Sequence, residues 1–282
     1  MKKIKGIFRL IRFELPFSAG VCVLMGQLLA LGEFATLTIS ILGFLSVFSI
    51  SASILVLNDY FDVETDKINA PHRPIPSNLV SPLEALIFSL ALLFSGLILS
   101  YLMSFTALLF SITWSMIGFL YNRRFKQKGI VGNILVSLSV GMTFIYGGVS
   151  VGLPFNKIAL FFGVIGALVD LGEEIAADSM DMKGDLIIDS KSLAIKYGKE
   201  TAIKISSLIF VIVILLTSIP FIANWFSLIY LLPIGIMDLS IAYFSFRLFK
   251  AKNEEGRKYI RMIYLGTTLG LIIFLILRLI LD

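Results

Sequence analysis

The amino-acid sequence predicts an all-α membrane protein whose helices cross the bilayer many times. Of its 282 residues, 57% are hydrophobic and 15% are charged, whereas an average soluble domain contains about 25% charged residues. Apolar stretches recur along the whole chain, and stretches of about 18 residues or more are long enough to cross a bilayer as a helix. A membrane β-barrel would instead alternate apolar and polar residues. We therefore expect a single domain of transmembrane helices over residues 1–282.

The hydrophobic pattern predicts about nine spans after a short amphipathic start. Residues 1–14 are basic and also contain Ile4, Ile7, Phe8 and Ile11, a composition typical of an interfacial helix. A signal peptide is the alternative, although the apolar run that follows is long and many further spans come after it. The expected spans are 15–32, 37–57, 83–103, 105–120, 132–152, 155–177, 202–222, 225–246 and 260–281.

The basic residues predict how the helices are oriented. If the amino terminus is cytoplasmic, 22 of the 24 Lys and Arg residues fall in cytoplasmic segments, and only Lys157 and Arg278 fall outside. This distribution follows the positive-inside rule, so we expect a multi-pass protein of the cell membrane with an external C-terminus. The net charge of +5 then reflects topology and anionic lipid, and it indicates no nucleic-acid partner. No obligate protein partner is indicated either.

The scarcity of cysteine and histidine excludes several kinds of site. The chain has one cysteine, Cys22, and one histidine, His72. A disulfide framework or a Cys/His zinc site needs more such residues. Cys22 lies in an apolar stretch, where we expect it to pack against other helices.

An acidic segment, "NDYFDVETD", follows the second predicted span. If that helix continues past residue 57 at about 100° per residue, Asn58, Asp59, Asp62 and Asp66 share one face and Glu64 points away. The segment therefore presents three carboxylates and an amide on one side, at the inner membrane surface.

A second acidic segment, "DLGEEIAADSMDMKGD", closes the sixth predicted span. Its carboxylates at positions Asp170, Glu174, Asp178, Asp181 and Asp185 fall on one narrow stripe of a helix. Asp170 lies within the span, where a carboxylate is functional by default. This stripe runs from inside the membrane to the same inner surface as the first segment.

Clustered carboxylates of this kind indicate a cation site. Like charges at helical spacing destabilise a helix by a few tenths of a kcal/mol per pair, and a charge at bilayer depth costs several kcal/mol. A bound cation offsets both costs, and oxygen ligands without Cys or His favour Mg²⁺. The alternative is that each stripe is a solvated face paired with nearby lysines.

Basic residues on the same side of the membrane extend this interpretation. Mg²⁺ held by a few carboxylates commonly takes phosphate as its remaining ligand. Arg73, Arg123, Arg124 and Lys126 lie in inner loops on that same side of the membrane and suit the other phosphate oxygens. A diphosphate with a lipid tail is therefore the expected ligand.

Several residues inside the predicted spans are candidates for shaping a cavity. They are Trp114, Tyr146 and the pair Gly147 and Gly148, although close helix packing explains the glycines equally well. Asp238 has no obvious partner, and we expect it to form a hydrogen bond between helices.

The two acidic segments resemble the signatures of UbiA-type intramembrane prenyltransferases. "NDYFDVETD" fits the N-D-x-x-D-x-x-x-D motif of that family, and "DSMDMKGD" is similar to its second aspartate-rich motif. "RPIPS", "YNRRFK…GN" and "SLAIKYGKETA" are supporting matches, so the resemblance covers essentially the whole chain. Ala70, Asn78 and Asn122 depart from the residues common in the family at the predicted cap loops.

The resemblance implies helices around a central cavity that opens laterally to lipid. A diphosphate is then held through Mg²⁺ between the two motifs, beneath a cap of inner loops. The implied metal ligands are Asn58, Asp59, Asp62, Asp66, Asp178, Asp181 and Asp185, with Glu174 adjacent. Of these, Asp62, Asp66, Asp181 and Asp185 are the expected catalytic residues. Together with the charge pattern, the expected substrate contacts are Arg73, Tyr121, Arg123, Lys126, Asn133, Tyr146 and Asp170.

Within the family, the segment "NDYFDVETDKIN…RPIPS" most resembles members that make archaeal ether lipids. Such enzymes transfer geranylgeranyl from its diphosphate to the hydroxyl of geranylgeranylglyceryl phosphate. The alternatives are relatives that prenylate an aromatic acceptor, 4-hydroxybenzoate or a naphthoate, in quinone synthesis. A cation transporter is a more remote alternative, because its carboxylates would be expected near the membrane midplane.

Overall fold

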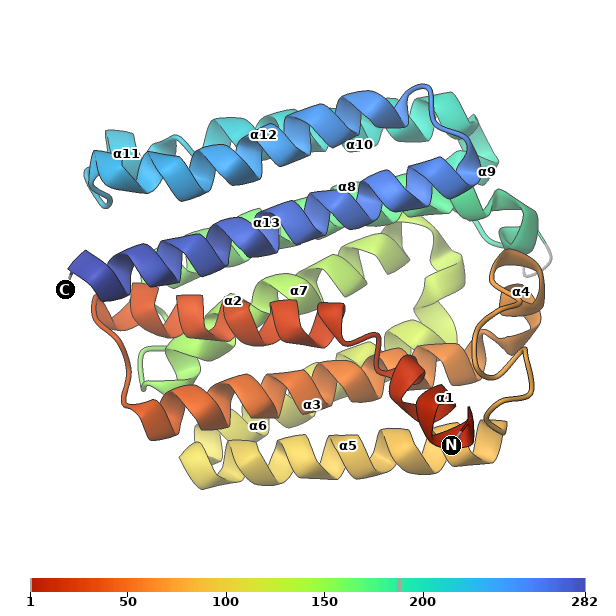
Figure 1. Cartoon of the computed structure of the whole chain (residues 1–282), viewed down its shortest axis with the longest axis horizontal. Helices are drawn as coiled ribbons and strands as arrows, with labels where there is room; N and C mark the ends of the chain where they lie inside the picture. The colour runs from red at the N-terminus through yellow and green to blue at the C-terminus, as the bar shows by residue number, and fades with distance from the viewer. Residues whose placement is uncertain (1, 187–188, 282) are drawn as a thin grey trace.

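The computed structural model describes residues 2–186 and 189–281, and every regular element in these ranges is a helix. The long helices run side by side along the long axis of one bundle (Figure 1). They are α2 (Glu14–Leu31), α3 (Leu37–Phe61), α5 (Pro82–Met103), α6 (Phe105–Leu120), α7 (Ile130–Ser150), α8 (Lys157–Asp185), α10 (Lys199–Leu216), α12 (Leu231–Leu248) and α13 (Asn253–Leu281).

Within the described residues, eight helices are long and apolar enough to cross a membrane. The expected span at 155–177 corresponds to α8, whose apolar stretch is interrupted by three acidic residues, Asp170, Glu173 and Glu174. α8 still packs inside the bundle, because its Gly163 lies against the backbone of Gly141 in α7. The all-helical membrane fold is confirmed, and the predicted count of nine spans is approximate.

Short helices gather at one end of the bundle, which we call the cap end. Figure 1 shows α1 (Lys2–Leu10), α4 (Val63–Asn69) and α9 (Leu193–Tyr197) there, and α11 (Ile219–Ile222) at the opposite end. The remaining elements are η1 (Tyr121–Phe125), η2 (Lys126–Lys128) and η3 (Leu228–Tyr230). α13 ends opposite the cap end, so the two ends of the described chain lie at opposite ends of the bundle (Figure 1).

Helix α1 is the amphipathic helix expected near the N-terminus, and it is attached to the bundle. Its Leu10 is fully buried in a cluster with Val56 of α3 and Ala85 of α5. Ile4 and Phe8 remain 61% and 65% exposed on its outer face, as suits a helix at a membrane surface.

Local sequence signals explain where several helices begin. At α5, the Ser81 hydroxyl accepts from the N–H of Glu84, and the Glu84 carboxylate accepts from the N–H of Ser81, with Pro82 as the first helical residue. At α8, the Asn156 side chain accepts from the backbone N–H groups of Ile158 and Ala159.

The glycines of α7 allow close helix packing. A Cβ atom added to Gly147 would lie 2.5 Å from the carbonyl oxygen of Val23 in α2. Only glycine therefore allows α2 and α7 to approach this closely.

Tyr146 belongs to a polar network in the interior of the bundle. Its side chain is fully buried, and its hydroxyl lies 2.8 Å from the Ser100 hydroxyl and 3.0 Å from the Ser46 hydroxyl. The network ties α7 to α3 and α5, because a buried hydroxyl needs a hydrogen-bond partner. Tyr146, expected as a substrate contact, instead joins helices.

Candidate active site

The two acidic segments line the same cavity, at the cap end of the bundle. Its volume is about 420 Å³. Asn58, Asp62 and Asp66 contribute from the first segment. From the second segment, the lining residues are Glu174, Asp178, Asp181 and Asp185. Residues more than a hundred positions apart in the sequence therefore face one space.

The first segment reaches the cavity because helical hydrogen bonding continues across the junction of α3 and α4. The N–H of Asp62 donates to the carbonyl of Asn58 at 2.9 Å, and the N–H of Asp66 donates to the carbonyl of Asp62 at 2.8 Å. Asp62 has φ −91° and ψ 8°, so the chain bends there without losing the helical order of its side chains.

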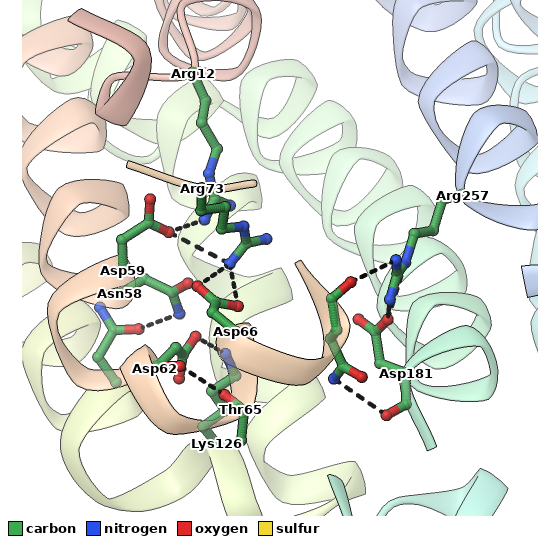
Figure 2. A network of polar contacts seen from close by, with 12 residues as sticks. Arg12, Asn58, Asp59, Asp62, Thr65, Asp66, Arg73, Lys126, Asp181 and Arg257 are labelled. Atoms are coloured by element: carbon green, nitrogen blue, oxygen red, sulfur yellow. Dashed lines mark hydrogen bonds and ion pairs between the residues drawn. The ribbon is translucent and has the colours of Figure 1, made fainter. Parts of the chain in front are cut away.

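Cations from four separate parts of the chain neutralise carboxylates at the cavity (Figure 2). Arg73 contacts both carboxylate oxygens of Asp66 at 2.6 Å, and it also reaches Asp59 at 3.4 Å. The other ion pairs are Arg12 with Asp59, Lys126 with Asp62, and Arg257 with Asp181. These cations come from the α1–α2 junction, the loop after α4, η2 and α13.

Burial makes these ion pairs necessary for the first segment. The side chains of Asp59, Asp62 and Asp66 are only 2%, 8% and 7% exposed. A buried carboxylate without a partner is strongly destabilising, typically by about 3–5 kcal/mol. Burial raises the pKa of Asp66, although Arg73 opposes this shift. For Arg73, burial acts to lower the pKa, but Asp59 and Asp66 outweigh it and raise the pKa overall, so Arg73 stays charged.

Asp59 occupies a different position from the other residues of its segment. Although the residue lies on the expected helix face, it does not line the cavity. Its carboxylate accepts from Arg12 and from Arg73 instead. Asp59 is therefore placed to hold two arginines, Arg12 from the α1–α2 junction and Arg73 from the loop after α4.

Asn69 joins the two acidic segments directly. Its side-chain oxygen accepts from the N–H of Gly184 at 3.1 Å, and its side-chain nitrogen donates to the carbonyl of Asp181 at 3.3 Å. The Asn69 backbone carbonyl accepts from Arg257 at 2.9 Å. The last residue of α4 is thus tied to both α8 and α13.

The remaining expected residues divide between the cavity and its surroundings. Tyr121, Lys126, Asn133 and Arg73 line the cavity, and Asn133 donates to Asp178 at 2.9 Å. Asp170 lies outside the lining and accepts from Ser137 at 3.0 Å. Arg123 lines a second, smaller pocket.

The residues that depart from the family pattern also have defined positions. Asn122 accepts from the Asn58 side chain at 2.9 Å and donates to the carbonyl of Ile54 at 3.0 Å, so it orients Asn58. Ala70 is buried at the cavity wall, and Asn78 forms an exposed turn with φ 57°.

Arg12, Asn69 and Arg257 were not predicted as site residues. Arg12 and Arg257 each lie among other basic residues of an inner segment, so nothing in the sequence distinguishes them as site residues. Arg12 adopts φ 48°, a left-handed conformation that is rare outside glycine and that the sequence does not indicate.

Asp238 forms the hydrogen bond between helices that the sequence predicts. Its carboxylate in α12 accepts from the Thr217 hydroxyl near the end of α10 at 2.9 Å.

The lining residues fit a magnesium ion that also binds a phosphate. They offer carboxylate and amide oxygens from both sides, which are the ligands Mg²⁺ prefers. Within the described residues, no three Asp or Glu side chains are grouped closely enough to hold a metal alone. Mg²⁺ is usually held by one or two carboxylates together with substrate phosphates and water, and the open arrangement suits this mode.

Comparison with known proteins gives a consistent result over nearly the full length. The UbiA prenyltransferase family profile matches residues 19–274. A digeranylgeranylglyceryl phosphate synthase from Methanococcus vannielii is 36% identical, covering 97% of this chain and 98% of the relative. The synthase of that name from Methanocaldococcus jannaschii is 34% identical, covering 90% of this chain and 89% of the relative.

Solved structures show the same fold. A structure concerned with digeranylgeranylglyceryl phosphate synthase in membranes has a TM-score of 0.68 at 30% identity, covering 96% of this chain and 99% of that chain. The apo UbiA homolog from Aeropyrum pernix K1 has a TM-score of 0.80 at 19% identity, covering 95% of this chain and 98% of that chain. The chain therefore belongs to the UbiA prenyltransferase family and is an integral-membrane prenyltransferase.

Proposed function

We propose that this prenyltransferase transfers a geranylgeranyl group from geranylgeranyl diphosphate to the free hydroxyl of geranylgeranylglyceryl phosphate, with Mg²⁺ as cofactor. The product is an ether-linked precursor of archaeal membrane lipid. The proposal is supported by relatives named digeranylgeranylglyceryl phosphate synthase at 32% to 36% identity. Structures of an Archaeoglobus fulgidus UbiA homolog bound to GPP and Mg²⁺, and to DMAPP and Mg²⁺, support the cofactor and the type of donor.

The observation that carries the proposal is the meeting of acidic and basic groups at one cavity. Asp62, Asp66 and Asp181 face it together with Lys126, Arg73 and Arg257. Carboxylates alone would repel a diphosphate, and cations alone would leave no ligands for a metal. Both together suit a diphosphate bound as its magnesium complex.

The residues proposed to hold the metal are those that line the cavity from the two segments. They are Asn58, Asp62, Asp66, Asp178, Asp181 and Asp185, with Glu174 adjacent. Asp59 supports them through Arg12 and Arg73. Bound Mg²⁺ supplies a Lewis acid that stabilises negative charge on the departing diphosphate.

The cations are proposed to complete the stabilisation of the leaving group. As the bond between C1 and the diphosphate oxygen breaks, Arg73, Lys126 and Arg257 donate to phosphate oxygens. The acceptor hydroxyl oxygen forms the new bond to C1, and its proton leaves to a carboxylate or to the released diphosphate. The prenyl chain lies along the apolar part of the wall, where Leu15, Ile54, Leu55 and Val136 line the cavity.

The cavity is proposed to face the cytoplasm. The cap end carries the inner segments that contain 22 of the 24 Lys and Arg residues, which the positive-inside rule places on that side. The N-terminus is then cytoplasmic and the C-terminus external.

The test is incubation of the purified protein with radiolabelled geranylgeranyl diphosphate, Mg²⁺ and one acceptor at a time. We expect labelled product with geranylgeranylglyceryl phosphate, none with 4-hydroxybenzoate, and none when EDTA replaces Mg²⁺. Product with 4-hydroxybenzoate alone would contradict the proposed acceptor. Product in EDTA would contradict the proposed cofactor.

A further inference from the structure

A second, smaller pocket adjoins the main cavity, between α4 and η1. Its volume is about 120 Å³, which suits a polar headgroup rather than a prenyl chain. Arg123, Arg124 and Glu64 line the smaller pocket but not the main cavity, whereas Asp62 and Lys126 line both. The ion pair between Asp62 and Lys126 therefore lies where the two pockets meet.

Two arginines give this pocket uncompensated positive charge. Lys126 pairs with Asp62, and Glu64 pairs with Lys67 at 2.7 Å. Among the described residues, no ion pair involves Arg123 or Arg124, and both side chains are exposed. An arginine fork is well matched to phosphate oxygens.

The arginines lie on a π-helical turn, Tyr121–Phe125, between α6 and α7. Such turns are rare and occur frequently at functional sites. The same turn places Tyr121 and Asn122 at the main cavity. The π-helical turn thus contributes side chains to both the main cavity and the smaller pocket.

An apolar surface lies beside the arginines. The rings of Phe61 and Phe119 are 6.1 Å apart, and their residues are 39% and 38% exposed. Arg123 lies over the Phe119 ring at 5.9 Å. A charged pocket next to exposed aromatic rings suits a ligand with an anionic head and an apolar tail.

We propose that Arg123 and Arg124 bind the phosphate of the lipid acceptor in this pocket, with its tail along Phe61 and Phe119. The acceptor hydroxyl then reaches the diphosphate cavity past Asp62 and Lys126. This inference rests on the proposed function, because it assigns the acceptor's phosphate monoester to a place beside that same site.

The test measures acceptor binding to the detergent-purified protein without donor and without Mg²⁺. Radiolabelled geranylgeranylglyceryl phosphate is titrated against wild type, the double variant Arg123→Gln/Arg124→Gln, and the control Lys128→Gln. Lys128 is an exposed cation of the same loop that lines neither pocket. We expect the double variant to bind at least about tenfold more weakly and the control to bind like wild type.

Binding of three further ligands shows which part of the acceptor the arginines recognise. Geranylgeranylglycerol, which lacks the phosphate, should bind the wild type and the double variant equally. Mg²⁺-dependent binding of geranylgeranyl diphosphate should be unchanged in the double variant, which also shows that the variant is folded. If inorganic phosphate alone binds wild type as tightly as the lipid phosphate, the lipid part of the inference is overturned.

The inference and the proposed function fail in different ways. Equal acceptor affinity in wild type and in the double variant overturns the inference while leaving acceptor transfer intact. Loss of donor binding in the double variant also overturns it, because the arginines would then serve the diphosphate. If wild type binds geranylgeranylglyceryl phosphate through the arginines but prenylates only 4-hydroxybenzoate, the proposed function fails and the pocket stands.

Discussion

The side chain of Asn69, at the end of α4, accepts the backbone N–H of Gly184 in α8. A Cβ atom at Gly184 would collide with the Asn69 side chain, so glycine is required for this contact. Asn69 also donates to the carbonyl of Asp181. The Asn69 amide thereby holds the end of α4 directly against α8, next to the bridge that Arg257 forms between the Asn69 carbonyl and Asp181.

Replacing Asn69 by Ala should weaken donor binding by about tenfold, because it removes the hydrogen bonds that hold α4 against α8. Gly184→Ala should have a similar effect by pushing Asn69 away. The measurement is the KM for geranylgeranyl diphosphate. Lys67→Ala is the control, since Lys67 is exposed on α4 and pairs with Glu64. Unchanged KM in both site variants would show that the contact does not set the geometry.

Replacing Arg257 by Ala should raise the KM for geranylgeranyl diphosphate by about tenfold, because the diphosphate loses a charged hydrogen-bond donor at the cavity wall. The ion pair with Asp181 is partly exposed, at 38% and 35%, so solvent screens it and folding should be little affected. Lys258→Ala, an exposed neighbour on α13, is the matched control. Arg257→Lys should retain more affinity than Arg257→Ala, and the reverse order would contradict a role for charge.

Arg12 allows backbone strain to be separated from side-chain chemistry. Arg12→Gly and Arg12→Ala both remove the ion pair with Asp59, but only glycine accepts φ 48° without strain. We expect equal losses of transfer activity in both variants. The glycine variant should melt ~2 °C or more above the alanine variant. The reason is that a non-glycine residue in the left-handed backbone conformation reduces the stability of the fold by about 1 kcal/mol. Equal melting temperatures would indicate that the turn relaxes.

Much of the fold and part of the site follow from the sequence alone. Long apolar runs predict the helices directly, because bilayer thickness sets their length. Helical periodicity placed Asp62, Asp66 and Asp181 on faces that line one cavity in the structure. Such predictions succeed where the relevant physics is local to one helix.

Contacts between distant helices were not predictable in the same way. Arg12 and Arg257 reach Asp59 and Asp181 across 47 and 76 positions, and their sequence context matches that of any basic inner segment. Tyr146 lies in an apolar span beside two glycines, and only the packing of α3, α5 and α7 places its hydroxyl among serines. Tertiary contacts decide these cases.

Gly147 offers a stability prediction away from the cavity. Gly147→Ala should lower the melting temperature in detergent, because the added Cβ atom would collide with the backbone of α2 near Val23. Gly235→Ala on α12 is the matched control, since a Cβ there meets nothing within 4 Å. Similar melting curves for the two variants would contradict the close approach of α2 and α7.

The most direct measurement is equilibrium binding of radiolabelled geranylgeranyl diphosphate to the purified protein, with and without Mg²⁺, in wild type, Asp62→Ala and Asp181→Ala. We predict that wild type binds only with Mg²⁺ and that each single variant loses this binding while its melting curve remains cooperative. Binding that survives EDTA, or that persists unchanged in either variant, would contradict a shared magnesium–diphosphate site between the two acidic segments.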